Sequence, residues 1–425
     1  MRRAGLPLRL PRSAAARVGL AAVAMIVAAE VAVILLAPGA EPLDALPVEA
    51  GDHFDETHID GARSYRTGQA WLMLAALGIQ AAVLLGLIFG RPAAARRALG
   101  RLGSRPVLGA ALAGAAIILV LGVAALPPRI VAHERAVDVG VSTQALGPWL
   151  WDAARSTAIS AALAALACAL LVAFLRRWPR RWWVPGAAAV VAIAIAYSWV
   201  APVVLGPIFN RFEALPEGSA LRAEVIELAE RADVDVGEVY VVDASRRGTR
   251  ESGYVAGLGS TKRVVLYDNL VENAPPEEVR LVVAHELAHV AHDDIPRGIG
   301  FVAIVAPFGL LFVRELGGAL ARRGGTEPGT PVALPAYVLA FGIASLVLGI
   351  AGNQLSRQVE ASADTFTLEL TGDPETMIDL QRRLSEANVS DPDPPAVLTF
   401  LTRTHPPTVE RIGIALAYER RRDGG

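Results

Sequence analysis

The chain has 425 residues, of which 53% are hydrophobic and only 19% are charged, and its formal net charge is −2. This composition, with a mean hydropathy of +0.42, excludes an ordinary soluble protein and indicates apolar residues exposed to lipid. The near-zero net charge gives no basic field for a nucleic-acid partner, and the single cysteine, Cys168, excludes a disulfide framework and a cysteine-rich metal site. Any metal site must therefore use histidine and carboxylate ligands.

Seven apolar runs approach or exceed the roughly 20 residues that a helix needs to cross the hydrocarbon core of a bilayer. They are Val18–Leu36, Ala70–Phe89, Pro106–Leu126, Thr157–Leu175, Trp182–Leu205, Gly298–Val313 and Pro331–Ile350. The first run follows several arginines and could be a signal peptide, but it is long for one and lacks a clear cleavage site, so a membrane anchor is favoured. Glu30 lies within it, as a functional carboxylate or as a tolerated polar contact between helices. The sixth run is short and carries Pro307, so it is expected to be kinked or partly covered by protein.

The segments between these runs fall into two sets by charge. One set is rich in arginine and comprises the N-terminus and the segments 91–105, 176–181 and 322–323. The other set contains all seven histidines. Seven crossings place the two sets on opposite membrane faces, and the positive-inside rule puts the histidine-containing face outside the cytoplasm. We therefore expect a multi-pass protein, in the plasma membrane, with any chemistry on its extracytoplasmic side.

The chain is predicted to be mainly α-helical and to have four parts. These are a membrane region with five spans (1–205), a first polar segment (206–297), a hairpin of two spans (298–350) and a second polar segment (351–425).

Hydrophobic periodicity predicts a small α+β unit in the first polar segment. An amphipathic helix over 219–232 is followed by a strand over 239–242 and by a β-hairpin with strands over 254–258 and 263–267. Two prolines and two glutamates at 275–278 then open a further helix, because both residue types suit a first helical turn.

This last helix contains the sequence His285-Glu286-Leu287-Ala288-His289. Residues i and i+4 share one helix face, so both imidazoles can bind one zinc ion, while Glu286 can act as general base toward a zinc-activated water. The alternative is a polar helix face that happens to hold two histidines. The apolar run 281–284 argues against it, since unpaired histidine and glutamate would be costly in a buried helix.

A catalytic zinc site needs a third protein ligand. His292 is near in sequence, but it follows His289 by only three residues, which is too short to close the site. The other candidate is Glu360 in the second polar segment, which is predicted to be helical with breaks at 372–374 and 390–395. Asp364 lies one turn after Glu360 and could orient a ligand imidazole. On spacing alone, a solvated helix face explains both acids equally well.

HExxH with a downstream ExxxD, separated by two spans and preceded by five, resembles the membrane-embedded M48 zinc metalloproteases, in particular the type-1 CAAX prenyl proteases. Further agreement lies in Gly206–Phe212, Val239–Asp243, Ser245–Arg247, Arg263–Asp268, Thr404–Pro407 and Glu410–Ile412. The resemblance implies seven helices around a chamber, capped by a zincin-like α+β protease domain that the last two spans split.

The resemblance also implies one zinc ion held by His285, His289 and Glu360, with Glu286 as base. It places His405 near the site, where this residue could stabilise the tetrahedral oxyanion. The alternative for His405 is a cap before the Pro-Pro helix start.

Substrate would extend along the strand that contains Ser252 and Tyr254. The resemblance therefore predicts that Ser252 and Tyr254 contact the substrate. The chain departs from the family at this point, because it has Ser-Gly-Tyr where the family usually has Asn-Ala-Tyr. The charge bias is a second departure, because the eukaryotic relatives work on the cytosolic side.

The predicted function is that of a zinc metalloendopeptidase acting on a peptide or protein substrate at the bilayer, with C-terminal processing of prenylated proteins as the implied reaction. General turnover of membrane proteins, as in the heat-shock M48 proteases, is the alternative within the enzyme class. A non-catalytic zinc-binding scaffold or receptor is the alternative of another class. A transporter is disfavoured, because the spans lack paired broken helices and buried charges.

Overall fold

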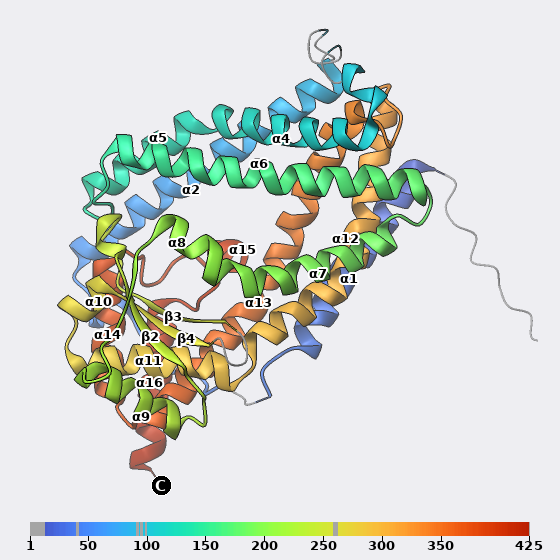
Figure 1. The fold of residues 1–425 in the computed structure, drawn as a ribbon. Helices are drawn as coiled ribbons and strands as arrows, with labels where there is room; N and C mark the ends of the chain where they lie inside the picture. Colours follow the sequence, from blue (N-terminus) through green and yellow to red (C-terminus); the bar gives the residue numbers. More distant parts are fainter. Residues whose placement is uncertain are drawn as a thin grey trace, which may run out of the picture.

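The computed structural model describes residues 13–39, 42–90, 93, 97, 100–257 and 262–424. The protein is mainly helical and contains one four-stranded sheet (Figure 1). The arginines before residue 13, much of the arginine-rich segment 91–105 and the predicted hairpin turn at 259–262, except for Lys262, lie outside the described residues.

Seven helices in the described residues are long and apolar enough to cross a membrane, which confirms the predicted number of spans. They are α1 (Ala14–Leu35), α2 (Glu56–Leu85), α4 (Pro106–Ala124), α6 (Leu146–Arg177), α7 (Trp183–Val200), α12 (Asp294–Arg323) and α13 (Leu334–Thr371). The chain is therefore a multi-pass integral membrane protein. That the spans enclose a chamber remains a prediction.

The last two spans are longer than their apolar runs. Helix α12 has 30 residues and includes Pro307, and α13 has 38 residues. The predicted domain boundary at residues 350 and 351 lies inside α13, which continues without a break from the membrane into the polar part of the chain. The four-part division of the chain remains a prediction.

The sheet has the strand order β1-β2-β4-β3, and β3 forms one of its edges. Its strands are β1 (Phe212–Ala214), β2 (Glu238–Val242), β3 (Gly253–Ala256) and β4 (Arg263–Tyr267). Strands β2 and β4 pair in parallel, and the other two pairs are antiparallel. The predicted strand and hairpin are confirmed, whereas β1 was not predicted, since three residues show no usable alternation.

Helices cover the sheet at the end of the molecule opposite α4 and α6 (Figure 1). Together with the sheet they form the region that the resemblance predicts to be the protease domain, and it is called the protease region below. These helices are α9 (Ala220–Arg231), α10 (Asp268–Asn273), α11 (Pro276–Ala291), α14 (Pro374–Ala387), α15 (Ala396–Thr402) and α16 (Thr408–Asp423). Helix α5 (Leu126–Asp138) connects the spans α4 and α6, and the short helix α8 (Gly206–Phe209) leads from α7 to β1. Both predicted breaks in the second polar segment are confirmed, the first by Gly372 with a φ of +71°, a conformation that favours glycine.

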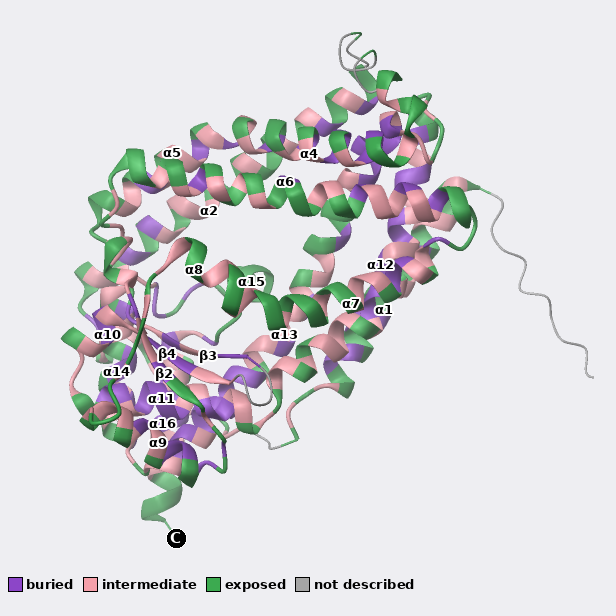
Figure 2. Cartoon of the chain, in the orientation of Figure 1, coloured by how far each residue is buried: buried purple, intermediate pink, exposed green. Residues whose placement is uncertain are grey.

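The protease region has its own apolar core. Leu266 of β4, Leu287 of α11 and Leu368 of α13 are fully buried there, together with residues of α9, α14 and α16. Figure 2 shows this concentration of buried residues beside the mostly exposed surfaces of α6 and α7. Because α13 also packs in a second core with α1 and α12, one helix joins the two regions.

Candidate metal centre

Helix α11 carries the two histidines of the HExxH sequence on one face. Its other face is apolar, and Leu281, Val283 and Leu287 are almost completely buried in the protease core. This packing fixes the rotation of the helix, so His285 and His289 point together, with ring centroids 4.9 Å apart. The helical spacing that the sequence predicted therefore places two imidazoles side by side.

Glu360 of α13 faces both imidazoles. Its carboxylate oxygens lie 3.1 Å from Nε2 of His285 and 3.8 Å from Nε2 of His289. One ligand atom from each of these three residues lies within 4.8 Å of the other two. Of the two candidates for a third ligand, the structure brings Glu360 to the histidines. The ring of His292 instead packs against Phe366, with centroids 5.3 Å apart.

Two further carboxylates hold the outer nitrogens of the imidazoles. Asp364 lies 3.1 Å from Nδ1 of His285, and Asp294 lies 2.8 Å from Nδ1 of His289. Each carboxylate has its own arginine: Arg411 donates two hydrogen bonds to Asp364, of 2.8 and 2.6 Å, and Arg297 donates one of 3.0 Å to Asp294. These contacts leave both Nε2 atoms directed at one shared point, as in metal sites with oriented histidines.

The sequence analysis missed Asp294, Arg297 and Arg411 as parts of this arrangement. Asp294 lies in the first turn of α12, where an acid is common at any helix start. It reaches His289 because Asp293, with a φ of +54°, turns the chain sharply between α11 and α12. Arg411 lies in the Glu410–Ile412 stretch that carries the resemblance, but its partner Asp364 lies 47 residues earlier, a pairing that spacing does not indicate.

The charges at this centre favour a dication. Four carboxylates (Glu286, Asp294, Glu360 and Asp364) face two guanidinium groups, so neutral imidazoles leave a net charge of −2. Burial opposes protonation of His285, yet the carboxylates of Asp364 and Glu360 outweigh burial and raise the pKa of His285 to about 10. Two imidazole nitrogens and one carboxylate are a common donor set of catalytic zinc, so the residues fit this ion.

Glu286 lies between the histidines and the edge of the sheet. The backbone N–H of Val255, in β3, lies close enough to this carboxylate to lower its pKa slightly. Burial raises the pKa of Glu286, and the neighbouring His285 and His289 lower it in part. A carboxylate in this position can accept and return a proton at the point where an edge-bound peptide would pass.

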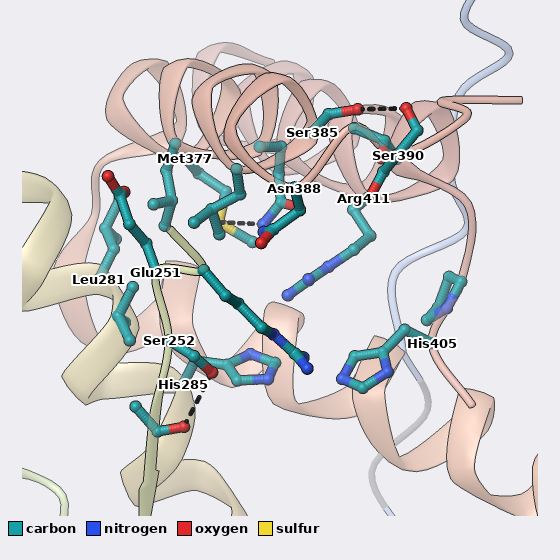
Figure 3. A pocket seen from close by; sticks show the side chains of 18 of the residues that line it. Glu251, Ser252, Leu281, His285, Met377, Ser385, Asn388, Ser390, His405 and Arg411 are labelled. Carbon is teal, nitrogen blue, oxygen red and sulfur yellow. Dashed lines mark hydrogen bonds between the residues drawn. The ribbon is translucent and has the colours of Figure 1, made fainter. Parts of the chain in front are cut away.

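His405 approaches the centre from the loop before α16. Its Nε2 lies 3.4 Å from a carboxylate oxygen of Glu360, and its Nδ1 lies 2.9 Å from the hydroxyl of Thr404. Figure 3 shows His405, His285 and Arg411 facing one space. Burial lowers the pKa of His405, which favours the neutral imidazole.

The two residues expected to contact substrate lie in different places. Ser252 lines the cavity beside His285, immediately before β3. Tyr254 lines a separate cavity of about 280 Å³ with Asn210 and Arg247, and its ring stands edge-on to Tyr267. The structure therefore brings Ser252, and not Tyr254, into the cavity that contains His285. Glu30 lies away from the centre and accepts a hydrogen bond of 3.4 Å from Gln354 of α13.

Two cavities flank the metal ligands. One, of about 420 Å³, is lined by His285, Glu286 and polar residues of the α14 region. The other, of about 410 Å³, is lined by Glu286, His289, Glu360 and apolar residues of α12 and α13. Glu286 borders both cavities, so a chain passing from one to the other crosses the general-base candidate.

Comparisons with known proteins agree with this geometry. Residues 217–419 match peptidase family M48, and residues 41–211 match the CAAX prenyl protease N-terminal family of five membrane helices. An uncharacterized metalloprotease, YhfN, of Bacillus subtilis is 25% identical over 69% of this chain and 70% of its own length.

Two relatives are CAAX prenyl proteases by name. A probable CAAX prenyl protease 1 of Schizosaccharomyces pombe is 30% identical over 53% of this chain and 48% of its own length. A homologue in Oryza sativa is 31% identical over 52% of both chains. The matched part of the chain thus spans about half the length of these relatives. The crystal structure of S. mikatae Ste24p superposes with a TM-score of 0.74, covering 95% of this chain and 99% of that one at 17% identity, which shows a shared fold.

Proposed function

The chain belongs to peptidase family M48, and from this premise we propose that it is a zinc metalloendopeptidase that trims the C-termini of lipidated peptides at the membrane. Membership makes it a membrane metallopeptidase with a protein substrate. The identity of the ion, the role of each residue and the lipidated substrate are the proposed parts. The observation that carries the proposal is the group of His285, His289 and Glu360 with Glu286 beside it.

His285, His289 and Glu360 would hold the zinc ion, and Asp364 and Asp294 would keep the two imidazoles oriented. A bound zinc ion supplies Lewis acidity, which polarises a peptide carbonyl and lowers the pKa of water. Glu286 takes the proton from the attacking water and delivers it to the departing amine. Each transfer is made by one carboxylate that both cavities expose.

His405 is proposed to donate a hydrogen bond to the oxygen that becomes negative as the peptide carbonyl is attacked. Its ring reaches the centre from the side opposite α11, next to Glu360. Ser252 is proposed to contact the peptide backbone at the start of β3. Tyr254 remains a proposed substrate contact, on the face of β3 that Tyr267 also borders.

The lipidated substrate is supported by the second cavity. Ile295, Phe301, Leu355 and Val359 give it an apolar wall that belongs to the two spans α12 and α13. Because both helices also span the bilayer, this wall is the proposed binding place of the lipid chain. The names of the curated CAAX prenyl protease relatives point to the same substrate class.

The deciding experiment compares the detergent-purified protein with its Glu286→Gln and Glu360→Ala variants. Zinc content and cleavage of matched prenylated and unprenylated quenched peptides are measured. We expect stoichiometric zinc in the wild type and in Glu286→Gln, loss of zinc in Glu360→Ala, and strongly reduced cleavage by both variants. Cleavage of unprenylated membrane proteins alone would favour general protein turnover, and zinc without Glu286-dependent cleavage would leave a zinc-binding scaffold.

The catalytic side is proposed to face away from the cytoplasm, on the charge bias of the connecting segments. A cysteine introduced at exposed Glu217 should react with a membrane-impermeant maleimide in intact cells, and one at exposed Arg323 should not. The native Cys168 is buried within α6 and should give little background. The reverse labelling pattern would place the protease region in the cytoplasm.

A further inference from the structure

A separate apolar cavity, called the membrane cavity below, lies between the spans and away from the metal ligands. It measures about 360 Å³ and is formed by α6 and α7 together with α4, α12 and α13. None of the described residues that line it is charged, and the polar atoms of their side chains belong to Cys168, Trp182 and Tyr337. An apolar cavity of this kind does not hold water, so a molecule that fills it must offer hydrocarbon.

Small residues keep the membrane cavity open. Ala164 and Ala167 of α6 line one wall, and Gly186 and Ala189 of α7 line another. Figure 1 shows α6 and α7 diverging from the loop that joins them. Larger side chains would fill the space between two diverging helices, whereas these four residues leave it free of protein atoms.

The length of the membrane cavity matches one leaflet of a bilayer. On α6 its lining runs from Phe174, near the joining loop, back to Leu163. On the other side it runs from Trp182, directly before α7, to Ile193. Each stretch covers eleven helical steps, or about 16 Å. Half of the hydrocarbon core of a bilayer is about 15 Å thick, so a lipid chain that starts at the loop ends where the cavity ends.

The membrane cavity is closed beside the loop and open farther from it. Trp182 and Tyr337 are almost completely buried, and their rings stand edge-on with centroids 6.3 Å apart. Leu163, Ile193 and Phe341 are 54%, 45% and 55% exposed. A hydrocarbon chain can therefore enter from the side, past the exposed residues, without displacing the buried aromatic pair.

Four arginines stand at the closed end, in residues 176–181, which we call the arginine loop. They are Arg176, Arg177, Arg180 and Arg181, and all four are exposed. Within the part of the chain that the structure describes, none of them forms an ion pair with a carboxylate. The guanidinium group of Arg177 lies 5.1 Å from the ring centre of Trp178. Arginines beside tryptophans are typical of the headgroup level of a bilayer, and a guanidinium group binds phosphate well.

The lipid of the proposed substrate does not fit this position. Phe341 lies 19 residues before Glu360 on the unbroken helix α13, which is about 28 Å along the helix axis. More than eight extended residues would be needed to bridge that distance. The lipid chain of the substrate is already assigned to the cavity that Glu286 borders, so the occupant of the membrane cavity is a different molecule.

We propose that the membrane cavity binds one acyl chain of an anionic phospholipid whose phosphate contacts the arginine loop. The charge bias of the connecting segments places this loop on the cytoplasmic side, where the leaflet is rich in anionic lipid. The bound chain fills the space between α6 and α7 and joins them to α12 and α13. This inference does not depend on the proposed peptidase function.

The test uses the full-length protein in detergent, freed of lipid and mixed with phosphatidylglycerol or phosphatidylcholine of identical acyl chains. Native mass spectrometry measures the concentration of each lipid at which half of the protein carries one molecule. We expect this concentration to be about fivefold lower, or less, for phosphatidylglycerol, because one arginine near an anionic headgroup contributes roughly this factor. Equal concentrations would show that the loop does not select an anionic lipid and would overturn the proposal.

Headgroup recognition is tested with the double variant Arg180→Gln/Arg181→Gln, in which the preference for phosphatidylglycerol should fall toward one. The matched control is Arg101→Gln/Arg105→Gln, which removes the same charge from exposed positions outside the membrane cavity. This control should keep the preference of the wild type. An equal loss in both proteins would indicate general charge attraction and would overturn the site.

Binding of the acyl chain is tested with Ala167→Phe, which places a ring inside the membrane cavity and should abolish retention of either lipid. Ala162→Phe is the matched control, because Ala162 is exposed on α6 and does not line the cavity. Retention that survives Ala167→Phe would put the chain elsewhere and overturn the proposal.

Fluorescence locates the chain even if Ala167→Phe does not fold. Phosphatidylglycerol with brominated acyl chains, at one lipid per protein, should quench Trp182 because this residue lines the membrane cavity. Quenching should therefore be smaller in Trp182→Phe than in the wild type. It should not be smaller in Trp199→Phe, since Trp199 lies on α7 beyond the cavity. Equal quenching in the wild type and Trp182→Phe would overturn the site. None of these measurements needs zinc or cleavage, so they do not test the peptidase proposal.

Discussion

Helices α7 and α11 are both rich in apolar residues, yet they use them in opposite ways. In α7 only Gly186 and Ala187 are buried, and large side chains such as Ile193 point outward. In α11 half of the 16 residues are buried, and the polar histidines are turned toward the centre. The first pattern suits a helix in lipid, and the second suits a helix between a sheet and other helices (Figure 2).

This contrast teaches that composition alone does not say where apolar residues are buried. On the exposed sides of the spans the bilayer takes the place of a protein core, so side chains there are held by few specific contacts. In the protease region the same residue types fill a packed interior that fixes the orientation of each ligand to the metal. Substitutions should therefore have very different effects in the two regions.

The largest effect is expected at Glu286, a side chain proposed to take part in catalysis, in contrast to Ile193, a side chain exposed on α7. Glu286→Gln keeps the shape of the side chain but cannot accept a proton, so kcat should fall by about 10²- to 10⁴-fold with zinc retained. Ile193→Ala, on the exposed face of α7, should keep kcat near the wild-type value. Peptide cleavage and metal analysis of both proteins test this; near-wild-type cleavage by Glu286→Gln would remove Glu286 from the mechanism.

The next effect concerns the buried pair of Asp364 and Arg411. Asp364→Asn leaves the Arg411 charge uncompensated, so the free energy of unfolding should fall by about 3–5 kcal/mol. Zinc affinity should fall by about 10- to 100-fold, because His285 loses the carboxylate beside its Nδ1. Unfolding in detergent and zinc competition with a chelator measure the two quantities. Unchanged zinc affinity would contradict the orienting role of Asp364.

A pair of leucines tests the contrast directly. Leu266→Ala removes a fully buried side chain of β4 and should cost about 2–5 kcal/mol of unfolding free energy. Leu163→Ala removes a side chain of α6 that is 54% exposed, and should cost well under about 1 kcal/mol, because no packed cavity is created. Equal losses in the two proteins, measured by thermal unfolding in one detergent, would show that Leu163 packs against protein.

The smallest effect is expected at His292, through pH. Burial lowers the pKa of His292 below its usual 6.5, so the unfolded chain binds a proton that the folded chain does not. The stability that depends on the neutral ring is complete above pH 6.5 and is lost as the pH falls toward the folded pKa. The wild type should therefore lose more stability on acidification than His292→Gln, measured by unfolding at several pH values.

The same variant tests the discarded ligand. His292→Gln should keep stoichiometric zinc, since the ring lies against Phe366 and outside the group formed by His285, His289 and Glu360. Loss of zinc in this variant would return His292 to the metal site.

The sequence predicts features that depend on local patterns, and it does not predict contacts that depend on tertiary packing. Long apolar runs, hydrophobic periodicity and the prolines and glutamates at 275–278 are local patterns, and they predicted the spans, the strands β2 to β4 and the helix α11. The partner of His289 was missed because Asp294 depends on the turn at Asp293, which no pattern of polarity encodes. Contacts across the chain, such as Arg411 with Asp364, depend on tertiary packing that one sequence does not display.

The role of Glu360 could not be decided from the sequence for a related reason. An acid on a helix face is ordinary at a surface, and only the approach of α13 to α11 makes it a ligand. Arg66 and Arg250 both line the cavity beside His285, and the sequence gives no sign of it, because Arg66 lies on α2, over 180 residues before Arg250. Their meeting depends on the arrangement of whole helices.

Helix α13 passes from lipid to the metal ligands without interruption, and this sets different rules for two kinds of genetic change. Replacing one apolar residue by another in its membrane half leaves the register of Glu360 unchanged. Inserting or deleting a single residue turns everything beyond it by about 100° and shifts it by about 1.5 Å, which moves Glu360 and Asp364 off the histidines. The membrane half of α13 is thus expected to accept many different apolar residues but almost no insertion or deletion.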